Sequence, residues 1–206
     1  MLALPDPPLL LITNRRQANL DLMTAIAAAL AGGCRWISIR EKDLPSDEQI
    51  ALAKAIKTKA EPYGARVMIH GSACLAREAG LDAVHLPASG NVGTARALLG
   101  INSWVSLSTH NLDEACRADA AGVDAVTLSP IFQTTSKPDY GPSIDLDGLE
   151  TVATAITKPV IALGGVGTTS ARLCLAKGAS GVAVMGEVMR SPTPAKTMVG
   201  LIRSLN

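Results

Sequence analysis

The sequence predicts an α/β fold, a single (β/α)8 TIM barrel that spans residues 1–206. Short runs of aliphatic and β-branched residues recur along the chain, and each is followed by an alanine-rich amphipathic stretch. Alternation of strands with helices requires a parallel sheet. Eight such units within 206 residues favour a closed barrel over an open doubly wound sheet. The glycine-rich dinucleotide fingerprint that an open sheet usually carries does not follow the first strand.

The expected strands and helices alternate from the first run to the last. Strands are expected at 9–12, 36–39, 67–69, 83–85, 104–107, 125–128, 160–163 and 181–184. Helices are expected at 19–31, 46–61, 72–79, 92–99, 111–121, 145–156, 168–177 and 193–204. Three residues are suited to cap a helix N-terminus: Ser46, Asn111 and Thr168. Three glycines follow apolar runs and are expected to end a helix: Gly80, Gly122 and Gly178.

Composition excludes several classes of protein. The formal charge is +1 and aromatic residues make up 2%, so we expect no binding to nucleic acid or to an anionic membrane. The four cysteines are too widely spaced for a zinc site or a disulfide framework, and we expect no metal site. The chain shows neither a signal peptide nor an apolar run of membrane-spanning length, which predicts a cytoplasmic protein.

Charged and polar side chains follow the expected strands, where a barrel carries its functional groups. Arg40 and Lys42 are two residues apart, so both can point into the barrel mouth and bind phosphate or carboxylate; a solvated charge run is an equal alternative. His70 ends the third strand and can act as acid or base, although a lone histidine is more often structural, and this applies more strongly to His85. Ser108 lies in a polar cluster expected to combine helix capping with lining of the site.

The longest loop, 129–142, follows the sixth strand. Its hydroxyl and amino groups could hold an anion, and the loop could fold over a ligand, because long loops in compact domains are usually functional. The residues concerned are Thr134, Ser136 and Lys137.

Glycines follow the last two strands, Gly164 and Gly165 after the seventh and Gly186 after the eighth. Glycine lets backbone amides approach a ligand closely, and these two loops form the usual phosphate site of the fold. We therefore expect phosphate binding here rather than tight turns alone.

Taken in order, these motifs resemble the thiamine phosphate synthase/TenI superfamily over essentially the whole chain. The most specific pieces are Arg40-Glu41-Lys42, Asp82-Ala83-Val84-His85-Leu86, Ser108-Thr109-His110, Ser129-Pro130-Ile131-Phe132 with Thr134, Ser136 and Lys137, and Ala162-Leu163-Gly164-Gly165-Val166. A synthase of this family joins a pyrimidine diphosphate to a thiazole phosphate and releases pyrophosphate. Members of the TenI-like branch isomerise a thiazole phosphate carboxylate by proton transfer.

The resemblance implies a role for each matching position. Pyrophosphate in a synthase would be held by Arg40, Lys42, Thr134, Ser136 and Lys137. Ser108 would lie near the reacting pyrimidine. The thiazole phosphate would be bound by the backbones of Gly164, Gly165 and Gly186.

The chain departs from the synthase pattern at three places. His70-Gly71 replaces an Asn-Asp pair, and no aspartate follows His85 where the family has one. Ser38 stands where a glutamine is expected. The two aspartates serve magnesium in the family, and a hard cation needs such oxygen ligands. The TenI-like branch is not matched fully either, because its catalytic histidine after the sixth strand is replaced by Pro130.

Three hypotheses follow. The first is a TenI-like enzyme of thiamine biosynthesis that binds a thiazole phosphate and catalyses a proton shift without metal or cofactor, with His70, Ser108 and Lys137 as catalytic residues. The second is a thiamine phosphate synthase, which would require Mg²⁺. The third is a non-catalytic regulatory protein that binds thiazole or thiamine phosphate. In each the partner is a small phosphorylated thiazole, and a homo-oligomer is compatible with the alanine-rich helices.

Overall fold

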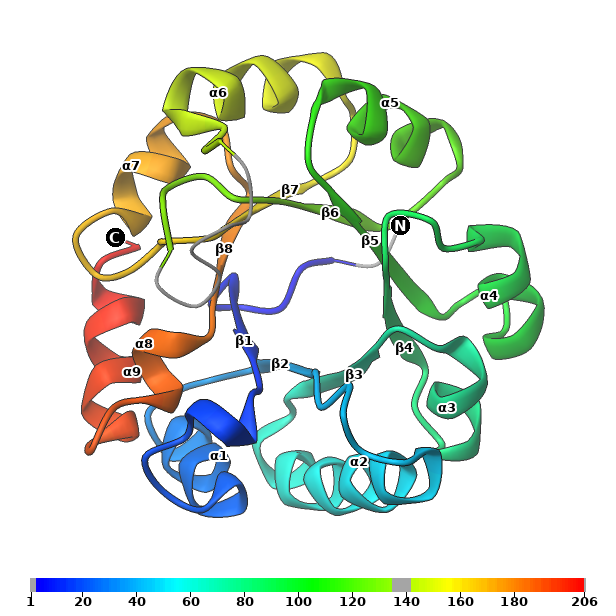
Figure 1. Cartoon of the computed structure of the whole chain (residues 1–206), viewed down its shortest axis with the longest axis vertical. Helices are drawn as coiled ribbons and strands as arrows, with labels where there is room; N and C mark the ends of the chain where they lie inside the picture. Colours follow the sequence, from blue (N-terminus) through cyan, green and yellow to red (C-terminus); the bar gives the residue numbers. More distant parts are fainter. Residues whose placement is uncertain (1–2, 135–141, 206) are drawn as a thin grey trace.

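Eight parallel strands close into a barrel in the order of the sequence, each paired with its neighbours and β8 with β1 (Figure 1). The computed structural model describes residues 3–134 and 142–205. The strands are β1 (Leu9–Ile12), β2 (Trp36–Ile39), β3 (Arg66–His70), β4 (Ala83–Leu86), β5 (Trp104–Thr109), β6 (Ala125–Leu128), β7 (Val160–Leu163) and β8 (Gly181–Val184). The prediction of a (β/α)8 barrel is confirmed.

The helices surround the barrel on its outer side (Figure 1). They are α1 (Leu22–Ala31), α2 (Ser46–Ala60), α3 (Ala73–Glu78), α4 (Val92–Leu99), α5 (Leu112–Ala120), α6 (Asp145–Ala155), α7 (Ala171–Ala176), α8 (Gly186–Met189) and α9 (Pro194–Arg203). Two short 3-10 helices are η1 (Arg15–Gln17), between β1 and α1, and η2 (Glu61–Tyr63), after α2. None of these helices is long and apolar enough to cross a membrane.

The capping residues expected from the sequence are only partly confirmed. Asn111 caps α5, since its side-chain oxygen accepts the N–H of Glu114 at 2.9 Å. Ser46 instead lies inside the first turn of α2, after Pro45. The N-cap position of α7 is Ser170, two residues after Thr168. The glycine stops are confirmed by left-handed backbone angles, with φ of 68° at Gly80, 78° at Gly122 and 87° at Gly178.

Two indoles fill the amino-terminal end of the barrel interior. Trp36 and Trp104 are the first residues of β2 and β5, and both are 1% exposed. Their rings meet edge to face, with centroids 5.7 Å apart, an arrangement that aromatic pairs favour. The guanidinium of Arg66 lies 4.5 Å from the centre of the Trp104 ring. This end is therefore packed, and the carboxyl ends of the strands are left to form the site.

A second apolar layer lies between the strands and the helices. Outward-facing strand residues such as Leu11, Ile37 and Val126 are fully buried there against the apolar faces of the helices. Strands that are buried on both faces explain the nearly continuous apolar runs in the sequence.

Candidate functional site

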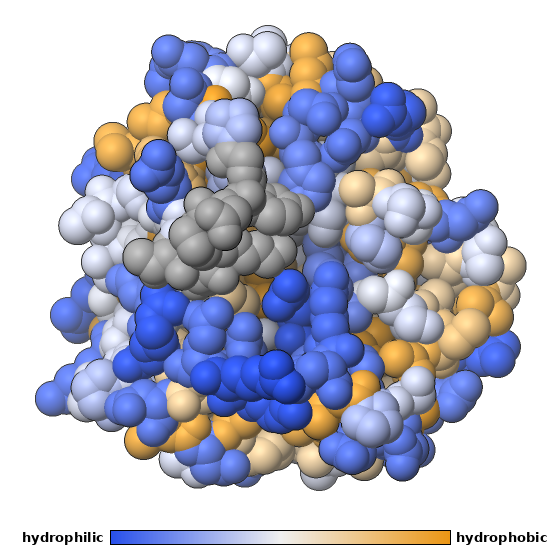
Figure 2. Space-filling view, in the orientation of Figure 1, coloured by the Kyte–Doolittle hydropathy of each residue, from blue (hydrophilic) through white to orange (hydrophobic). Residues whose placement is uncertain are grey.

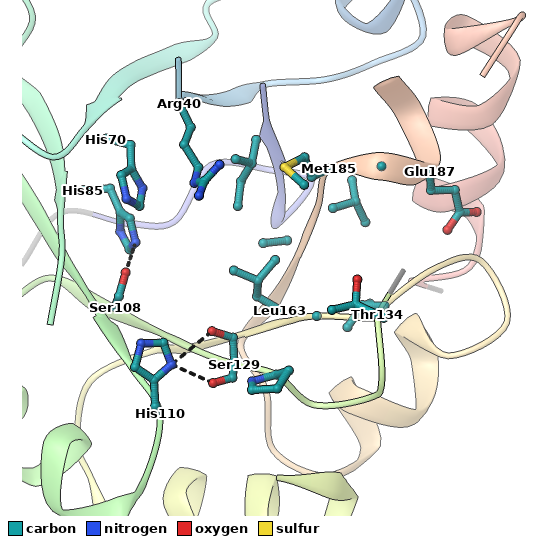
Figure 3. A pocket seen from close by; sticks show the side chains of 18 of the residues that line it. Arg40, His70, His85, Ser108, His110, Ser129, Thr134, Leu163, Met185 and Glu187 are labelled. Atoms are coloured by element: carbon teal, nitrogen blue, oxygen red, sulfur yellow. Dashed lines mark hydrogen bonds between the residues drawn. The ribbon is translucent and has the colours of Figure 1, made fainter. Parts of the chain in front are cut away.

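A cavity of about 390 Å³ opens at the carboxyl ends of the strands (Figure 3). Its lining brings together most of the site residues predicted from the sequence: Arg40, Lys42, His70, Ser108, Thr134, Gly164, Gly165 and Gly186. Two further predicted residues, Ser136 and Lys137, lie outside the described residues. The volume falls within the range usual for small-molecule sites.

Arg40 and Lys42 point into the cavity because the residue between them is anchored elsewhere. Glu41 is 3% exposed and accepts the hydroxyl of Thr13 at 2.7 Å and the backbone N–H of Arg15 at 3.0 Å. The backbone N–H of Arg40 donates to the Thr13 hydroxyl at 3.0 Å. These bonds connect the end of β2 to the end of β1 and orient both cations toward the mouth.

Positive charge is concentrated on this side of the mouth. Burial lowers the pKa of Lys42, and the neighbouring charge of Arg40 lowers it further. Arg15, which does not line the cavity, pairs with Asp43 at 2.7 Å. Figure 2 shows a hydrophilic surface over the region of β1 and β2. Two cations this close together favour an anionic ligand that carries more than one charge.

His85 is buried beneath Ser108 and takes part in a small polar network. Its Nδ1 lies 2.9 Å from the Ser106 hydroxyl, and its Nε2 lies 2.9 Å from the Ser108 hydroxyl and 3.3 Å from that of Thr127. Burial, assisted by the charge of Lys42, lowers the pKa of His85 to about 4. The ring is therefore neutral near pH 7, with both nitrogens engaged, and its geometry suits positioning of Ser108.

Two more histidines line the cavity. The His70 ring lies 5.0 Å from that of His85, at the end of β3 (Figure 3). The Nδ1 of His110 lies 2.8 Å from the backbone carbonyl oxygen of Ser129. Because a carbonyl oxygen only accepts, this nitrogen of His110 carries a proton.

The glycines after β7 face the loop after β6 at very short range. Gly164 and Gly165 have φ of 96° and 65°, values that favour glycine. A Cβ on Gly164 would lie 2.8 Å from the Cα of Pro130, and one on Gly165 would lie 2.6 Å from the carbonyl oxygen of Gln133. Close packing of the two loops therefore requires both glycines, in addition to any contact with a ligand.

Several residues of the lining were not singled out in the sequence analysis. The polar ones are Gln133, Glu187 and Arg190, together with Ser129 and His110, which were noted only within motifs. Glu187 lies on the short helix α8, one residue after Gly186, and Arg190 is the C-cap residue of that helix. The four-residue spacing between Gly186 and Arg190 could have indicated that the two residues lie on one side of a helical turn. The sequence analysis did not use this spacing, because it predicted no separate helix at this place.

The described lining does not fit a magnesium site made of protein carboxylates. Glu187 is the one carboxylate among the described lining residues, and its Oε1 accepts the N–H of Thr168 at 3.3 Å. Figure 3 places it on the opposite side of the cavity from Arg40. Within residues 3–134 and 142–205 there is also no group of three or more His, Cys, Asp or Glu side chains that could hold a metal ion.

The fold and the cavity define a (β/α)8 barrel protein whose mouth is suited to a small anionic ligand. The family model described as thiamine monophosphate synthase matches residues 9–188. The chain therefore belongs to the thiamine monophosphate synthase (TMP-TENI) family, as the motifs predicted.

Individual relatives agree with this assignment. A protein of Geobacter sulfurreducens named "Putative thiamine-phosphate synthase" is 38% identical over 97% of this chain and 95% of its own length. A thiamine-phosphate synthase of a Roseiflexus species is 33% identical over 89% of this chain and 78% of its own length. The solved structure of a thiamine phosphate pyrophosphorylase from Pyrococcus furiosus superposes with a TM-score of 0.86 and 26% identity, covering 96% of this chain and 94% of that one.

Proposed function

We propose that this enzyme is a thiamine phosphate synthase, which joins hydroxymethylpyrimidine diphosphate to a thiazole phosphate and releases pyrophosphate. The observation that carries the proposal is that two sets of anion-binding groups share one cavity with Ser108. One set is the cationic pair Arg40 and Lys42, and the other consists of the glycine-rich ends of β7 and β8. A reaction between two anionic substrates needs both sets. The relatives named as synthases support this function over the TenI-like proton shift (thiazole tautomerase-like isomerisation), which the departures from the family pattern favoured.

The reaction breaks the bond between the methylene carbon of the pyrimidine and the diphosphate oxygen, and the electron pair leaves with the pyrophosphate. The thiazole nitrogen donates its lone pair to the same carbon. Arg40 and Lys42 would stabilise the charge that develops on the leaving group, as preorganised cations do at transferring phosphates. Thr134, Ser136 and Lys137 would add hydrogen-bond donors from the loop after β6.

A second candidate is the metal-independent proton shift of a thiazole phosphate carboxylate. It is favoured by the histidines of the lining and by the poor fit of the described residues to a magnesium site. His70 would exchange the proton in this reaction, because His85 has both ring nitrogens engaged and a low pKa of about 4. Arg40 and Lys42 would then bind the substrate carboxylate.

One experiment separates these functions. The purified protein is incubated with pyrimidine diphosphate and either thiazole phosphate or its carboxylate, with and without magnesium, and all products are followed. Formation of thiamine phosphate and pyrophosphate would support the synthase. Isomerisation of the carboxylate alone, lost in His70→Ala without loss of phosphate binding, would support the proton shift. Binding without either product would leave a non-catalytic binding protein and overturn both candidates.

A further inference from the structure

The side chain of Arg190, the C-cap residue of α8, folds back over Gly186, the first residue of that helix. A Cβ placed on Gly186 would lie 2.6 Å from the Cζ of Arg190, and the three heavy atoms closest to it all belong to this guanidinium. Both residues line the cavity. The planar cation thus rests on the Gly186 backbone, in a space that any larger residue at position 186 would fill.

A residue from the opposite end of the chain holds the guanidinium in this place. The Nη1 of Arg190 donates to the side-chain oxygen of Gln17 at 2.6 Å. Gln17 ends η1, in the connection that follows β1, so the contact joins the first and last units of the barrel. A guanidinium held by a hydrogen bond is oriented before a ligand arrives, which reduces the entropy lost on binding.

The charge of the neighbouring Glu187 is directed away from this position. Its carboxylate packs against Gly167, with Cδ 3.0 Å from the position of a Cβ there, and accepts the N–H of Thr168. The acidic side chain therefore occupies the backbone amide of Thr168 in the loop after β7. An anion beside Gly186 would therefore contact the guanidinium of Arg190. The negative charge of Glu187 is farther away and would reduce the affinity for that anion.

We infer that Arg190, seated on Gly186 and oriented by Gln17, is the side chain that selects a phosphorylated thiazole over the free thiazole alcohol. The inference rests on the proposed function, because it assigns the thiazole phosphate to this end of the cavity. An arginine fork can donate two parallel hydrogen bonds to a phosphate, whereas an alcohol offers a single weaker acceptor. Gly186 is required because it leaves room for the guanidinium.

Calorimetry with thiazole phosphate and with the corresponding alcohol tests this inference. We expect Arg190→Gln to weaken binding of the phosphate by about 10- to 100-fold, the usual effect of losing a hydrogen bond between charged groups, and to leave binding of the alcohol unchanged. Gly186→Ala should have the same selective effect although the arginine is still present. The φ angle of Gly186 is not in the left-handed region, so an alanine at this position fits the backbone and displaces only the guanidinium of Arg190. Glu187→Gln should strengthen binding of the phosphate.

Arg203→Gln is the matched control, because it removes an exposed arginine of α9 that does not line the cavity. If the native protein prefers the phosphate and Arg190→Gln keeps that preference, the role of Arg190 is wrong while the proposed function stands. If the native protein binds neither thiazole, the proposed function and this inference both fail.

Discussion

The Nε2 of His85 lies 2.9 Å from the Ser108 hydroxyl, and the pair connects the buried interior of the barrel to the lining of the cavity. The opposite ring nitrogen is held by Ser106 at the same distance. Because the imidazole is fixed at both nitrogens, it determines the direction of the Ser108 hydroxyl.

Replacing His85 should therefore affect catalysis more than substrate binding. We expect His85→Ala to lower kcat by about 10- to 100-fold, with little change in KM. Without the imidazole, the Ser108 hydroxyl loses its orientation, and this weakens an interaction made mainly in the transition state. His85→Gln keeps a group that can bond to Ser108 and should retain more activity. Steady-state kinetics of both variants, with circular dichroism to verify folding, checks this. An unchanged kcat in His85→Ala would contradict a positioning role.

Burial of His85 also makes stability depend on pH. The folded pKa of about 4 is lower than the ordinary 6.5, so the unfolded chain takes up a proton first as the pH falls. The contribution is fully present above pH 6.5 and is lost between about pH 6.5 and 4, amounting to about 2 kcal/mol by pH 5. Denaturant unfolding at pH 7 and pH 5 measures it. In His85→Gln, the decrease in unfolding free energy between pH 7 and pH 5 should be smaller by this amount. An equal decrease in the variant and in the native protein would show that other groups cause it.

Glu41 should be needed for stability as well as for binding of pyrophosphate. Its side chain is buried and accepts bonds from Thr13 and Arg15, which Glu41→Ala would leave unpaired. We expect a loss of about 2 to 4 kcal/mol in unfolding free energy. Pyrophosphate affinity should also fall, because Arg40 and Lys42 lose their orientation. Asp43→Ala, which removes a solvent-exposed partner of Arg15, should leave stability nearly unchanged. Equal losses in the two variants would contradict this account.

Two glycine substitutions should differ in their effect on function. Gly165→Ala places a methyl group 2.6 Å from the carbonyl oxygen of Gln133, so the loop after β6 must move and ligand affinity should fall at least 10-fold. Gly122→Ala has a similarly positive φ of 78° but nothing within 4 Å. It should cost about 1 kcal/mol of stability and leave affinity unchanged. Calorimetry measures the ligand affinity of both variants, and thermal unfolding measures their stability. Equal affinities in Gly165→Ala and Gly122→Ala would contradict the prediction.

The fold and the side chains on the strands could be predicted from the sequence, because strand spacing and two-residue parity determine them. Two-residue parity also predicted correctly that Arg40 and Lys42 share one cavity, although both lie just beyond β2 and are oriented by the bonds of Glu41 rather than by strand pairing. Glu187 and Arg190 could not be found in this way, since their position depends on α8, a single turn that the sequence pattern did not separate from the helix after it. The packing of Gly164 and Gly165 against the β6 loop involves residues distant in sequence, so spacing alone could only indicate closeness to a ligand.

Trp36 and Trp104 also bear on the order of events at the site. Because the two indoles pack the amino-terminal end of the barrel, a molecule that reaches Ser108 arrives and departs through the mouth at the carboxyl ends of the strands. In the proposed synthase reaction, two substrates would share this single entrance and would have to enter one after the other. The substrate that binds deeper in the cavity would have to bind first, and the part of the product derived from it would leave the cavity last.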